Sequence, residues 1–437
     1  MKVYSSFAKH GLLPLADLIL GQSIAGNLKL IKTCQKWSRE EVKEYQNSKF
    51  LELVTSFYTQ SPYYAKMLDA LGLRISDIRS IEDIKYLPIL TKKIIKENYD
   101  RLIPLNINNV KHKKDATGGS TGNPMKYLIS IDSLSFTTAF NIFCWERAGW
   151  SYGDSYIALG SSSLFSSTNI KFKYHMYNKI RGRIPLNGVS LPKGVLDNYI
   201  QLIKRKKVKF IYGYASAIYL LAKYVLENHI ELDIKICFPT SEILTSLYRN
   251  TIKQAFGCKI MDCYGARDGG IGAYEIEDSK YFVSYNSFVE VIQPDDTGNG
   301  KIIVTDLNNF AFPFIRYELG DEVNLLNNNT TSYNGQVLGK ILGRTSDIIH
   351  LGNGRSLTGP GFTILFKDLN IESYQLKQDN NLELTCFLKR NNNYSLSEEK
   401  IIYDTLKRQA GNECKINIEY VDEFLLSKSG KKAYFMV

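Results

Sequence analysis

The sequence lacks the two glycine signatures that commonly mark a nucleotide site, because neither GxGxxG nor GxxxxGK[ST] occurs in it. It also has no CxxC pair, and its seven cysteines are an odd number spread along the chain. This pattern excludes a zinc ribbon and a disulfide framework, and it predicts reduced thiols in a cytoplasmic protein. The five histidines are also dispersed, so we expect no metal cluster of the zinc type.

Long apolar runs are missing too, since none reaches the roughly 18 residues that a membrane-spanning helix needs. The most lipid-like stretch, residues 11–20, is interrupted by Pro14 and Asp17, and a peripheral membrane contact there stays open as an alternative. The net charge of +11 includes the basic runs 111–114 and 204–207, which are short and contain no interleaved aromatics. We therefore expect no nucleic-acid partner, and interpret the runs as solvated faces or as an attraction for anions.

The 437 residues are enough for at least two domains, and a hydrophobic content of 44% predicts a large core. Ser38 and Glu41 form a capping-box pattern that predicts a helix over 38–58, and Thr91 is the expected N-cap of 92–98. Further along, short apolar runs alternate with amphipathic ones, which is typical of parallel βαβ units. The predicted strands are 156–159, 208–212, 234–238 and 259–263, and the predicted helices are 195–206, 215–228 and 247–256.

The pattern changes beyond residue 288, where 288–293 and 301–306 read as a hairpin. A smaller segment follows, with predicted strands over 382–388 and 416–421 and a helix over 397–409. We predict an α/β protein with a large N-terminal domain of mixed and parallel sheets and helices, residues 1–342. A hinge at 343–347 leads to a small mobile α+β domain, residues 348–437, and the site is expected at the interface between the two.

A glycine-rich stretch, residues 116–124, is the strongest local signal in the chain. It contains three glycines and three hydroxyl side chains and ends at Pro124. Glycines let backbone N–H groups approach a ligand closely, and successive amides with nearby hydroxyls can surround an anion. The stretch therefore suits a polyphosphate, although an ordinary flexible loop has a similar composition.

Four later stretches follow it in order: 262–268 (DCYGARD), 314–321 (FIRYELGD), 343–349 (GRTSDII) and 427–431 (SKSGK). Together with residues 117–124, this series resembles the adenylate-forming enzymes. Within them it is most similar to the phenylacetate–CoA ligase group and its relatives encoded with capsular polysaccharide genes. The stretches 87–92 (LPILTK) and 240–242 (TSE) fit the same group. Each motif alone is weak, but five in order along nearly the whole chain are specific.

The resemblance implies that a carboxylate attacks the α-phosphate of ATP, that pyrophosphate leaves, and that the acyl group then passes to an acceptor. ATP and Mg²⁺ are the implied cofactors, with coenzyme A as a candidate acceptor. Because both reactants are anions, the residues mainly position them and neutralise charge. The implied site residues are Thr117, Gly118, Gly119, Ser120, Thr121 and Gly122 for phosphates, Tyr264 and Gly265 beside the nucleotide, Asp321 for ribose, Arg344 for ribose or phosphate, Asp268 for Mg²⁺, and Lys431 as the catalytic cation.

Simpler interpretations stand beside these roles. Asp321 follows a glycine and could cap a turn. Arg316 and Arg344 could form surface ion pairs, and Lys431 could be a solvated lysine, with Lys428 and Lys432 competing for its role.

The chain also departs from the family pattern. Where Ser or Thr followed by Glu is usual, this sequence has Arg267-Asp268. The hinge position, commonly Asp or Lys, is Ser346, and Glu275-Ile276 replaces the Glu-Cys of many relatives, which argues against a metal site there. These changes leave open a specialised or catalytically weakened member.

Three functions remain open at this point. The first is acyl transfer to a thiol, of coenzyme A or a carrier protein, in surface polysaccharide biosynthesis. The second is an amide or ester ligase acting on an amine or hydroxyl of a sugar such as an amino sugar, and the third is a non-catalytic nucleotide-binding scaffold. The acid itself cannot be read from the sequence, although 161–167 and 212–216 are the expected lining of its pocket.

Overall fold

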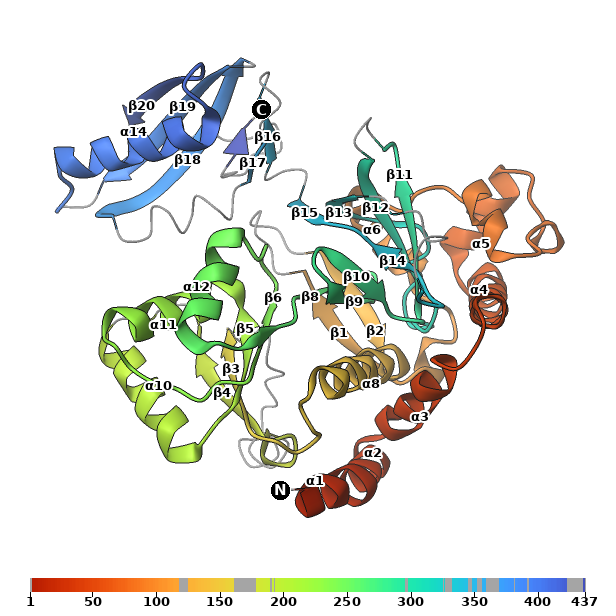
Figure 1. Cartoon of the computed structure of the whole chain (residues 1–437). Helices are drawn as coiled ribbons and strands as arrows, with labels where there is room; N and C mark the ends of the chain where they lie inside the picture. Colours follow the sequence, from red (N-terminus) through yellow and green to blue (C-terminus); the bar gives the residue numbers. More distant parts are fainter. Residues whose placement is uncertain are drawn as a thin grey trace. The chain divides into compact units, whose positions relative to one another are not determined.

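The structure is a computed structural model of the chain (Figure 1). It describes residues 2–117, 125–160, 178–188, 191, 193–294, 298–324, 326, 332–344, 348–351, 356–358, 369–380, 382–390, 393–422 and 435–436. The chain divides into two units, of which the first comprises 1–118, 125–319 and 323–340. The second comprises 119–124, 320–322 and 341–437. The predicted hinge lies at residues 343–347, of which 345–347 are outside the described residues, so the hinge stays a prediction.

Helices fill the start of the first unit, and the sequence analysis recognised only part of them. Both predicted caps are confirmed: the backbone N–H of Glu41 donates to Ser38 Oγ at 3.1 Å, and that of Ile94 donates to Thr91 Oγ1 at 3.3 Å. The helices are α1 (Lys2–Phe7), the π-helix η1 (Ala8–Leu12), α2 (Leu13–Leu20), α3 (Ile24–Cys34), α4 (Arg39–Gln60), α5 (Pro62–Ala70), α6 (Lys92–Glu97) and α7 (Tyr99–Leu102). Short 3-10 helices are η2 (Ile75–Asp77), η3 (Ile81–Tyr86) and η4 (Ile107–Asn109). Among the described residues, no helix is long and apolar enough to cross a membrane.

A hairpin that the sequence analysis did not predict holds the two ends of the glycine-rich stretch. Strands β1 (His112–Ala116) and β2 (Lys126–Ser130) pair antiparallel, with Ala116 opposite Lys126. Helix α8 (Ile131–Ala148) follows directly, and Ser130 Oγ caps it by accepting a hydrogen bond from Ser133 N at 3.1 Å. The hairpin thus continues into the helix that packs against the large sheet.

The large sheet has a parallel half in the strand order β4-β3-β5-β6. It is built from β3 (Tyr156–Gly160), β4 (Arg183–Asn187), β5 (Phe210–Tyr214), β6 (Ile236–Thr240) and β7 (Lys259–Ile260), with helices α10 (Lys193–Lys206), α11 (Ala215–Glu227) and α12 (Ser246–Phe256). The predicted alternation of strands and helices is confirmed. A single strand over 259–263 is wrong, because β7 ends at Ile260 and a separate strand, β8 (Cys263–Ala266), follows; each of the two pairs with β6.

The other half of the same sheet is antiparallel and has the order β8-β9-β10-β14. Its further strands are β9 (Ile271–Glu277), β10 (Lys280–Val283) and β14 (Val337–Leu338). A second sheet contains β11 (Ser287–Ile292), β12 (Asn299–Asp306) and β13 (Tyr317–Asn324). The pairing of β11 with β12, from Ser287 opposite Asp306 to Ile292 opposite Lys301, confirms the predicted hairpin.

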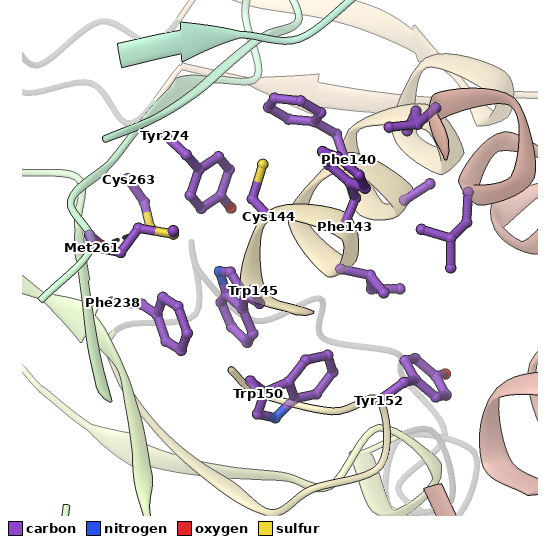
Figure 2. Close-up of a cluster of buried hydrophobic side chains, with 14 of the residues drawn as sticks. Phe140, Phe143, Cys144, Trp145, Trp150, Tyr152, Phe238, Met261, Cys263 and Tyr274 are labelled. Atoms are coloured by element: carbon purple, nitrogen blue, oxygen red, sulfur yellow. Dashed lines mark hydrogen bonds between the residues drawn. The ribbon is translucent and has the colours of Figure 1, made fainter. Parts of the chain in front are cut away.

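Aromatic and sulfur side chains form the core between α8 and the large sheet (Figure 2). Trp145 of α8 stacks on Phe238 of β6, with ring centroids 4.4 Å apart and an interplanar angle of 13°. Phe140 of the same helix meets Tyr274 of β9 edge-on at 5.7 Å. One helix therefore packs across both halves of the sheet, which fixes the antiparallel strands relative to the parallel ones.

The second unit carries its own core. Strand β15 (Ile341–Arg344) begins it, and β16 (Ile348–His350) pairs with β17 (Ser356–Thr358). A four-stranded sheet in the order β20-β19-β18-β21 follows, with β18 (Ile371–Asn380), β19 (Glu383–Arg390), β20 (Lys415–Tyr420) and β21 (Phe435–Met436). Ile402 and Leu406 of α14 (Leu396–Ala410) are fully buried with the apolar residues of this sheet. The predicted α+β character of this segment is confirmed.

Candidate functional site

The base of the glycine-rich stretch is closed by Thr117 and Met125. Thr117 N donates to the Met125 carbonyl at 3.0 Å, and Met125 N donates to Thr117 Oγ1 at 2.9 Å. A hydroxyl that accepts one hydrogen bond still has its O–H to donate, so Thr117 can both close the loop and contact an anion. Gly118, Gly119, Ser120, Thr121, Gly122 and Pro124 lie outside the described residues.

The turn after β8 holds Arg267 and Asp268. Two glycines with positive φ end it, Gly269 at +94° and Gly270 at +65°. A Cβ on Gly270 would lie 2.0 Å from Oδ2 of Asp306, so a residue with a side chain cannot occupy this position without a shift. The turn is therefore built directly against the Asp306 carboxyl group.

Asp306 is fully buried, and the sequence analysis did not single it out. Ser133 Oγ donates to its Oδ2 at 2.6 Å, and Asn308 N donates to its Oδ1 at 3.1 Å. Burial raises the pKa of Asp306 to about 6, against the lowering effect of these hydrogen bonds. Through Ser133 and Gly270, this carboxyl group links α8 to the turn that carries Asp268.

Asp268 itself is half-buried, and its Oδ2 accepts a hydrogen bond of 2.9 Å from the hydroxyl of Tyr317. Tyr317 is fully buried at the start of β13, within the 314–321 stretch that the sequence analysis had singled out. A carboxylate held by a buried tyrosine has a restricted orientation. The tyrosine is therefore a positioning residue for Asp268 that motif reading had not assigned.

An ion pair joins the Asp268 turn to the base of the glycine hairpin. Arg267 Nη1 lies 3.3 Å from Asp115 Oδ2, and the two side chains are 46% and 27% exposed. Exposed pairs of this kind add little stability, so the contact matters for placement rather than for the fold. Burial raises the pKa of the nearby Tyr127, and the negative charges of Asp115 and Asp268 raise it further. The carboxylates of Asp115, which precedes the glycine-rich stretch, and of Asp268 thus both act on Tyr127.

This donor set fits a magnesium ion carried by ATP. Mg²⁺ is commonly held by one or two carboxylates together with substrate phosphates, and not by a cage of protein ligands. Asp268 supplies one such carboxylate, whereas Asp115 Oδ1 accepts from Ala116 N at 2.8 Å and its Oδ2 pairs with Arg267. Among the residues that the structure describes, no group of three or more His, Cys, Asp or Glu side chains is placed to hold a metal by itself.

Tyr264 and Gly265 lie on β8, opposite Ala273 and Gly272 of β9. A Cβ on Gly265 would be 3.1 Å from the Ile271 carbonyl oxygen, so the narrow strand spacing favours glycine. Asp321 lies inside β13 and not in a turn, which removes the turn-cap interpretation. Of Arg344, only the backbone is described, as the end of β15, and Ser346, Lys428, Lys431 and Lys432 lie outside the described residues.

Two further sequence interpretations can be compared with the structure. Arg316 does form an ion pair, but the predicted surface location is wrong because the residue is buried. Its Nη2 donates to Glu290 Oε1 at 2.8 Å and its Nε donates to Glu290 Oε2 at 3.0 Å. Its Nη1 also donates to the Leu87 carbonyl at 2.6 Å, so it ties the 87–92 stretch to the second sheet. Glu275 is buried, and its Oε1 lies 2.6 Å from Arg249 Nη2. Its carboxylate therefore forms an ion pair within the fold.

One of the two predicted acid-binding stretches, residues 212–216, lies at the carboxyl end of the parallel strand β5. Ser216 N, at the start of α11, donates to Glu242 Oε2 at 2.8 Å and so joins 212–216 to the 240–242 stretch. Tyr212 of β5 lies against Trp145, with ring centroids 5.1 Å apart. Residues 161–167 lie outside the described residues.

Comparison with known proteins shows which protein families this chain is similar to. Residues 352–436 match the CapK C-terminal domain. Protein CapK of Staphylococcus aureus is 25% identical over 429 residues, which cover 94% of this chain and 95% of that protein. The phenylacetate-coenzyme A ligase of Aromatoleum evansii is also 25% identical, over 73% of this chain and 74% of that protein. The chain is a homologue of CapK and of the phenylacetate–CoA ligases.

Solved structures show the same fold. A 2-hydroxyisobutyryl-CoA ligase in the postadenylation state, in complex with R3-HIB-AMP, has a TM-score of 0.65 at 15% identity, over 92% of this chain and 90% of that chain. The same ligase in its thioesterification state, with 2-HIB-AMP and CoA, has a TM-score of 0.60 at 15% identity, over 91% and 90% of the two chains. This CapK homologue therefore has the fold of the acyl-CoA ligases, and the resemblance inferred from the five motifs is confirmed.

Proposed function

We propose that this chain is an ATP-dependent ligase that converts a carboxylic acid and ATP into acyl-AMP and pyrophosphate, and then transfers the acyl group to a thiol. The observation that carries the proposal is the 3.3 Å contact between Arg267 and Asp115, which brings the Asp268 turn to the base of the glycine-rich hairpin. Homology to CapK and to the phenylacetate–CoA ligases supports it.

In the first step, a carboxylate oxygen of the acid attacks the α-phosphorus, and the bond to the bridging oxygen of pyrophosphate breaks. Residues 117–122 hold the β- and γ-phosphates through backbone N–H groups and hydroxyls. Asp268, oriented by Tyr317, would hold Mg²⁺, which would neutralise phosphate charge when it is bound. Tyr264 and Gly265 flank the nucleotide, Asp321 accepts hydrogen bonds from the ribose hydroxyls, and Arg344 donates hydrogen bonds to the ribose or to a phosphate.

The second unit completes the site in this proposal. Residues 343–347 act as a hinge, and the domain 348–437 closes to bring Lys431 to the α-phosphate during adenylation. A cation placed where negative charge develops stabilises the transition state by an estimated 2.7–4 kcal/mol, the range known for lost oxyanion donors. Lys431 serves this step and not the acyl transfer.

The second step needs a nucleophile to replace AMP on the acyl carbon, and the thiol of coenzyme A is the acceptor we favour. The homology to phenylacetate–CoA ligases supports this acceptor. A second acceptor class is an amine, such as that of an amino sugar, and one relative favours it. The indoleacetate–lysine synthetase of Pseudomonas savastanoi is 25% identical over 185 residues, 40% of this chain and 43% of that protein.

A role in surface polysaccharide biosynthesis is the biological context we propose, supported by the CapK homologue that spans nearly the whole chain. A cytoplasmic location, where ATP and coenzyme A are available, goes with it. All seven cysteines are buried and unpaired, which is consistent with a reducing compartment.

Exchange of labelled pyrophosphate into ATP tests the first step. The purified chain is incubated with ATP, Mg²⁺ and a panel of aryl, fatty, hydroxy and amino acids. We expect exchange that depends on one acid class. Exchange with none of them, in a folded protein that binds ATP, would point to the nucleotide-binding scaffold instead.

Trapping the activated acid separates the acceptors. With the acid found above, coenzyme A should yield a thioester, and hydroxylamine should yield a hydroxamate whichever natural acceptor is used. Hydroxamate without any thioester would favour a carrier protein or an amino sugar over coenzyme A.

A further inference from the structure

Helix α2 exposes apolar side chains on a face that has no counterpart elsewhere in the first helices. Leu18 is 82% exposed, Ile19 73% and Leu15 53%, and the spacing of 15, 18 and 19 places them on one side of the helix. Phe7, 60% exposed, precedes them on α1, and Leu20 follows. We call Phe7, Leu15, Leu18, Ile19 and Leu20 the α2 patch.

The opposite face of the same helix is already packed. Leu13 is buried in the core and Asp17 is 7% exposed, with its Oδ2 accepting a hydrogen bond of 2.7 Å from Ala25 N at the start of α3. A helix face made of large apolar side chains is normally covered by another surface. The α2 patch therefore lacks a covering surface that its composition requires.

Contacts at both ends of the segment hold α2 in place, so the helix cannot rotate to bury the α2 patch. Lys9 forms an ion pair with Glu146 of α8, and Ser5 Oγ donates to the Tyr152 carbonyl at 2.8 Å. At the end of α2, Gly21 N and Gln22 N both donate to the Asp17 carbonyl. These contacts fix both ends of the segment, so the exposed side chains point away from the protein as part of the folded state.

Positive charge accompanies the patch. Residues 1–37 contain five lysines, of which Lys9 and Lys32 pair with Glu146 of α8, and their one acidic residue is Asp17, which is buried. The ammonium group of Lys111 lies beside the end of α2, since a Cβ on Gly21 would be 3.1 Å from its Nζ. Lys111 begins the exposed basic run that continues through Lys113 and Lys114. Apolar side chains next to lysines, with no exposed acid in the segment, match an anionic bilayer surface and not a neutral or basic partner.

We propose that the α2 patch is a peripheral membrane site. Leu15, Leu18 and Ile19 enter the boundary between headgroups and acyl chains of an anionic membrane, while Lys111 meets the lipid phosphates. This inference rests on exposure and charge in the first unit and is independent of the proposed catalytic function.

Co-sedimentation of the full chain with vesicles tests it. The chain should bind vesicles of phosphatidylcholine mixed with phosphatidylglycerol, bind those of phosphatidylcholine alone much less, and lose binding as salt rises. The double variant Leu18→Ser/Ile19→Ser should lower the partition coefficient by about tenfold or more, because two apolar side chains no longer leave water. Lys111→Gln should lower it about fivefold on the anionic vesicles only.

The control is Leu71→Ser/Leu105→Ser, which removes two leucines that are 48% and 74% exposed away from the patch. Its vesicle binding should equal that of the parent. The proposal is wrong if the parent does not bind the anionic vesicles or if the control loses binding equally. It is also wrong if sedimentation velocity shows a dimer that only the patch variant disrupts, because the patch would then join two copies of this chain.

Discussion

The two halves of the large sheet differ in how they are built and in what they contribute. In the parallel half, β3 and β6 are buried along their whole length, and local apolar runs specify them. In the antiparallel half, β8 leads into a turn whose residues depend on distant groups: Tyr317 for Asp268 and Asp306 for Gly270. The comparison teaches that the parallel strands can be recognised from local sequence, whereas the candidate site is made of contacts between residues far apart in the sequence.

Removing the Asp268 carboxylate is the change with the largest expected effect on the antiparallel side. Asp268→Ala should reduce pyrophosphate exchange by about 10³-fold or more at ordinary Mg²⁺, since a metal ion supplies several kcal/mol of charge stabilisation. Asp268→Glu should keep or improve the rate. Tyr317→Phe keeps the carboxylate but removes the hydrogen bond that orients it, so it should lower the rate less than Asp268→Ala does. Parental rates in both Asp268 variants would mean that the motif is assigned to the wrong residue.

The second unit contributes Lys431, the proposed catalytic cation, and replacing it has the next largest expected effect. Lys431→Ala should lower adenylation by about 10²–10³-fold, because a charge that faces the transition state is lost. Transfer from ready-made acyl-adenylate should stay close to normal, as measured by thioester formation. Lys428→Ala is the control. If it fails while Lys431→Ala is active, the motif is shifted by three residues, and equal loss of both steps in Lys431→Ala would contradict the separate roles.

Two glycines with nearly the same φ allow the cost of a steric clash to be distinguished from the cost of a strained backbone. Gly257, beside the parallel half, has a φ of +59° and open space around a built Cβ, whereas Gly270 has +65° and meets Asp306. Gly257→Ala should cost about 1–2 kcal/mol of unfolding free energy from the left-handed backbone alone. Gly270→Ala should cost about 2–5 kcal/mol because overpacking adds to that strain. Urea unfolding measures both, and equal losses would show that the Asp306 contact does not constrain the turn.

The smallest expected effect concerns the pH dependence of stability. Burial raises the pKa of Asp306 from its ordinary value of 3.8 to about 6 in the folded protein, so folding favours its protonated form. The resulting stability is fully present below about pH 4 and is lost as the pH rises through 6. Asp306→Asn should flatten this window by at most about 3 kcal/mol, since the two pKa values differ by about two units. Unfolding of parent and variant at pH 4 and 7 measures it, and parallel pH profiles would contradict the assignment.

Sequence alone predicted the parts of the fold that short-range rules govern. The capping box at Ser38 and Glu41 and the N-cap at Thr91 needed only neighbours in the chain, and both formed. The strand predicted at 208–212 forms two residues later, at Phe210, because pairing with β3 and β6 sets its register. Strand β9 was missed, since Gly272 and Glu275 interrupt its apolar pattern and only its position between β8 and β10 makes it a strand.

The residues of the candidate site likewise fall into those that sequence motifs identified and those that only the fold brings together. Motif order identified the 116–124 and 262–268 stretches, because glycines and carboxylates at those spacings carry their chemistry locally. Asp115 could not be predicted as a partner of Arg267, since 152 residues separate them. Nor could Asp306, which is an unremarkable residue at the end of β12 until the fold brings Ser133 and Gly270 to it.

The central claim is that the glycine-rich hairpin binds the phosphates of ATP, and equilibrium binding of MgATP to one variant tests it most directly. In Gly119→Val the side chain should block backbone approach and raise the dissociation constant about tenfold or more, the expected loss for a hydrogen bond to a charged group. Gly194→Val, in α10 with open space around its Cβ, is the control and should bind as the parent does. Unchanged MgATP affinity in a folded Gly119→Val protein would contradict the account.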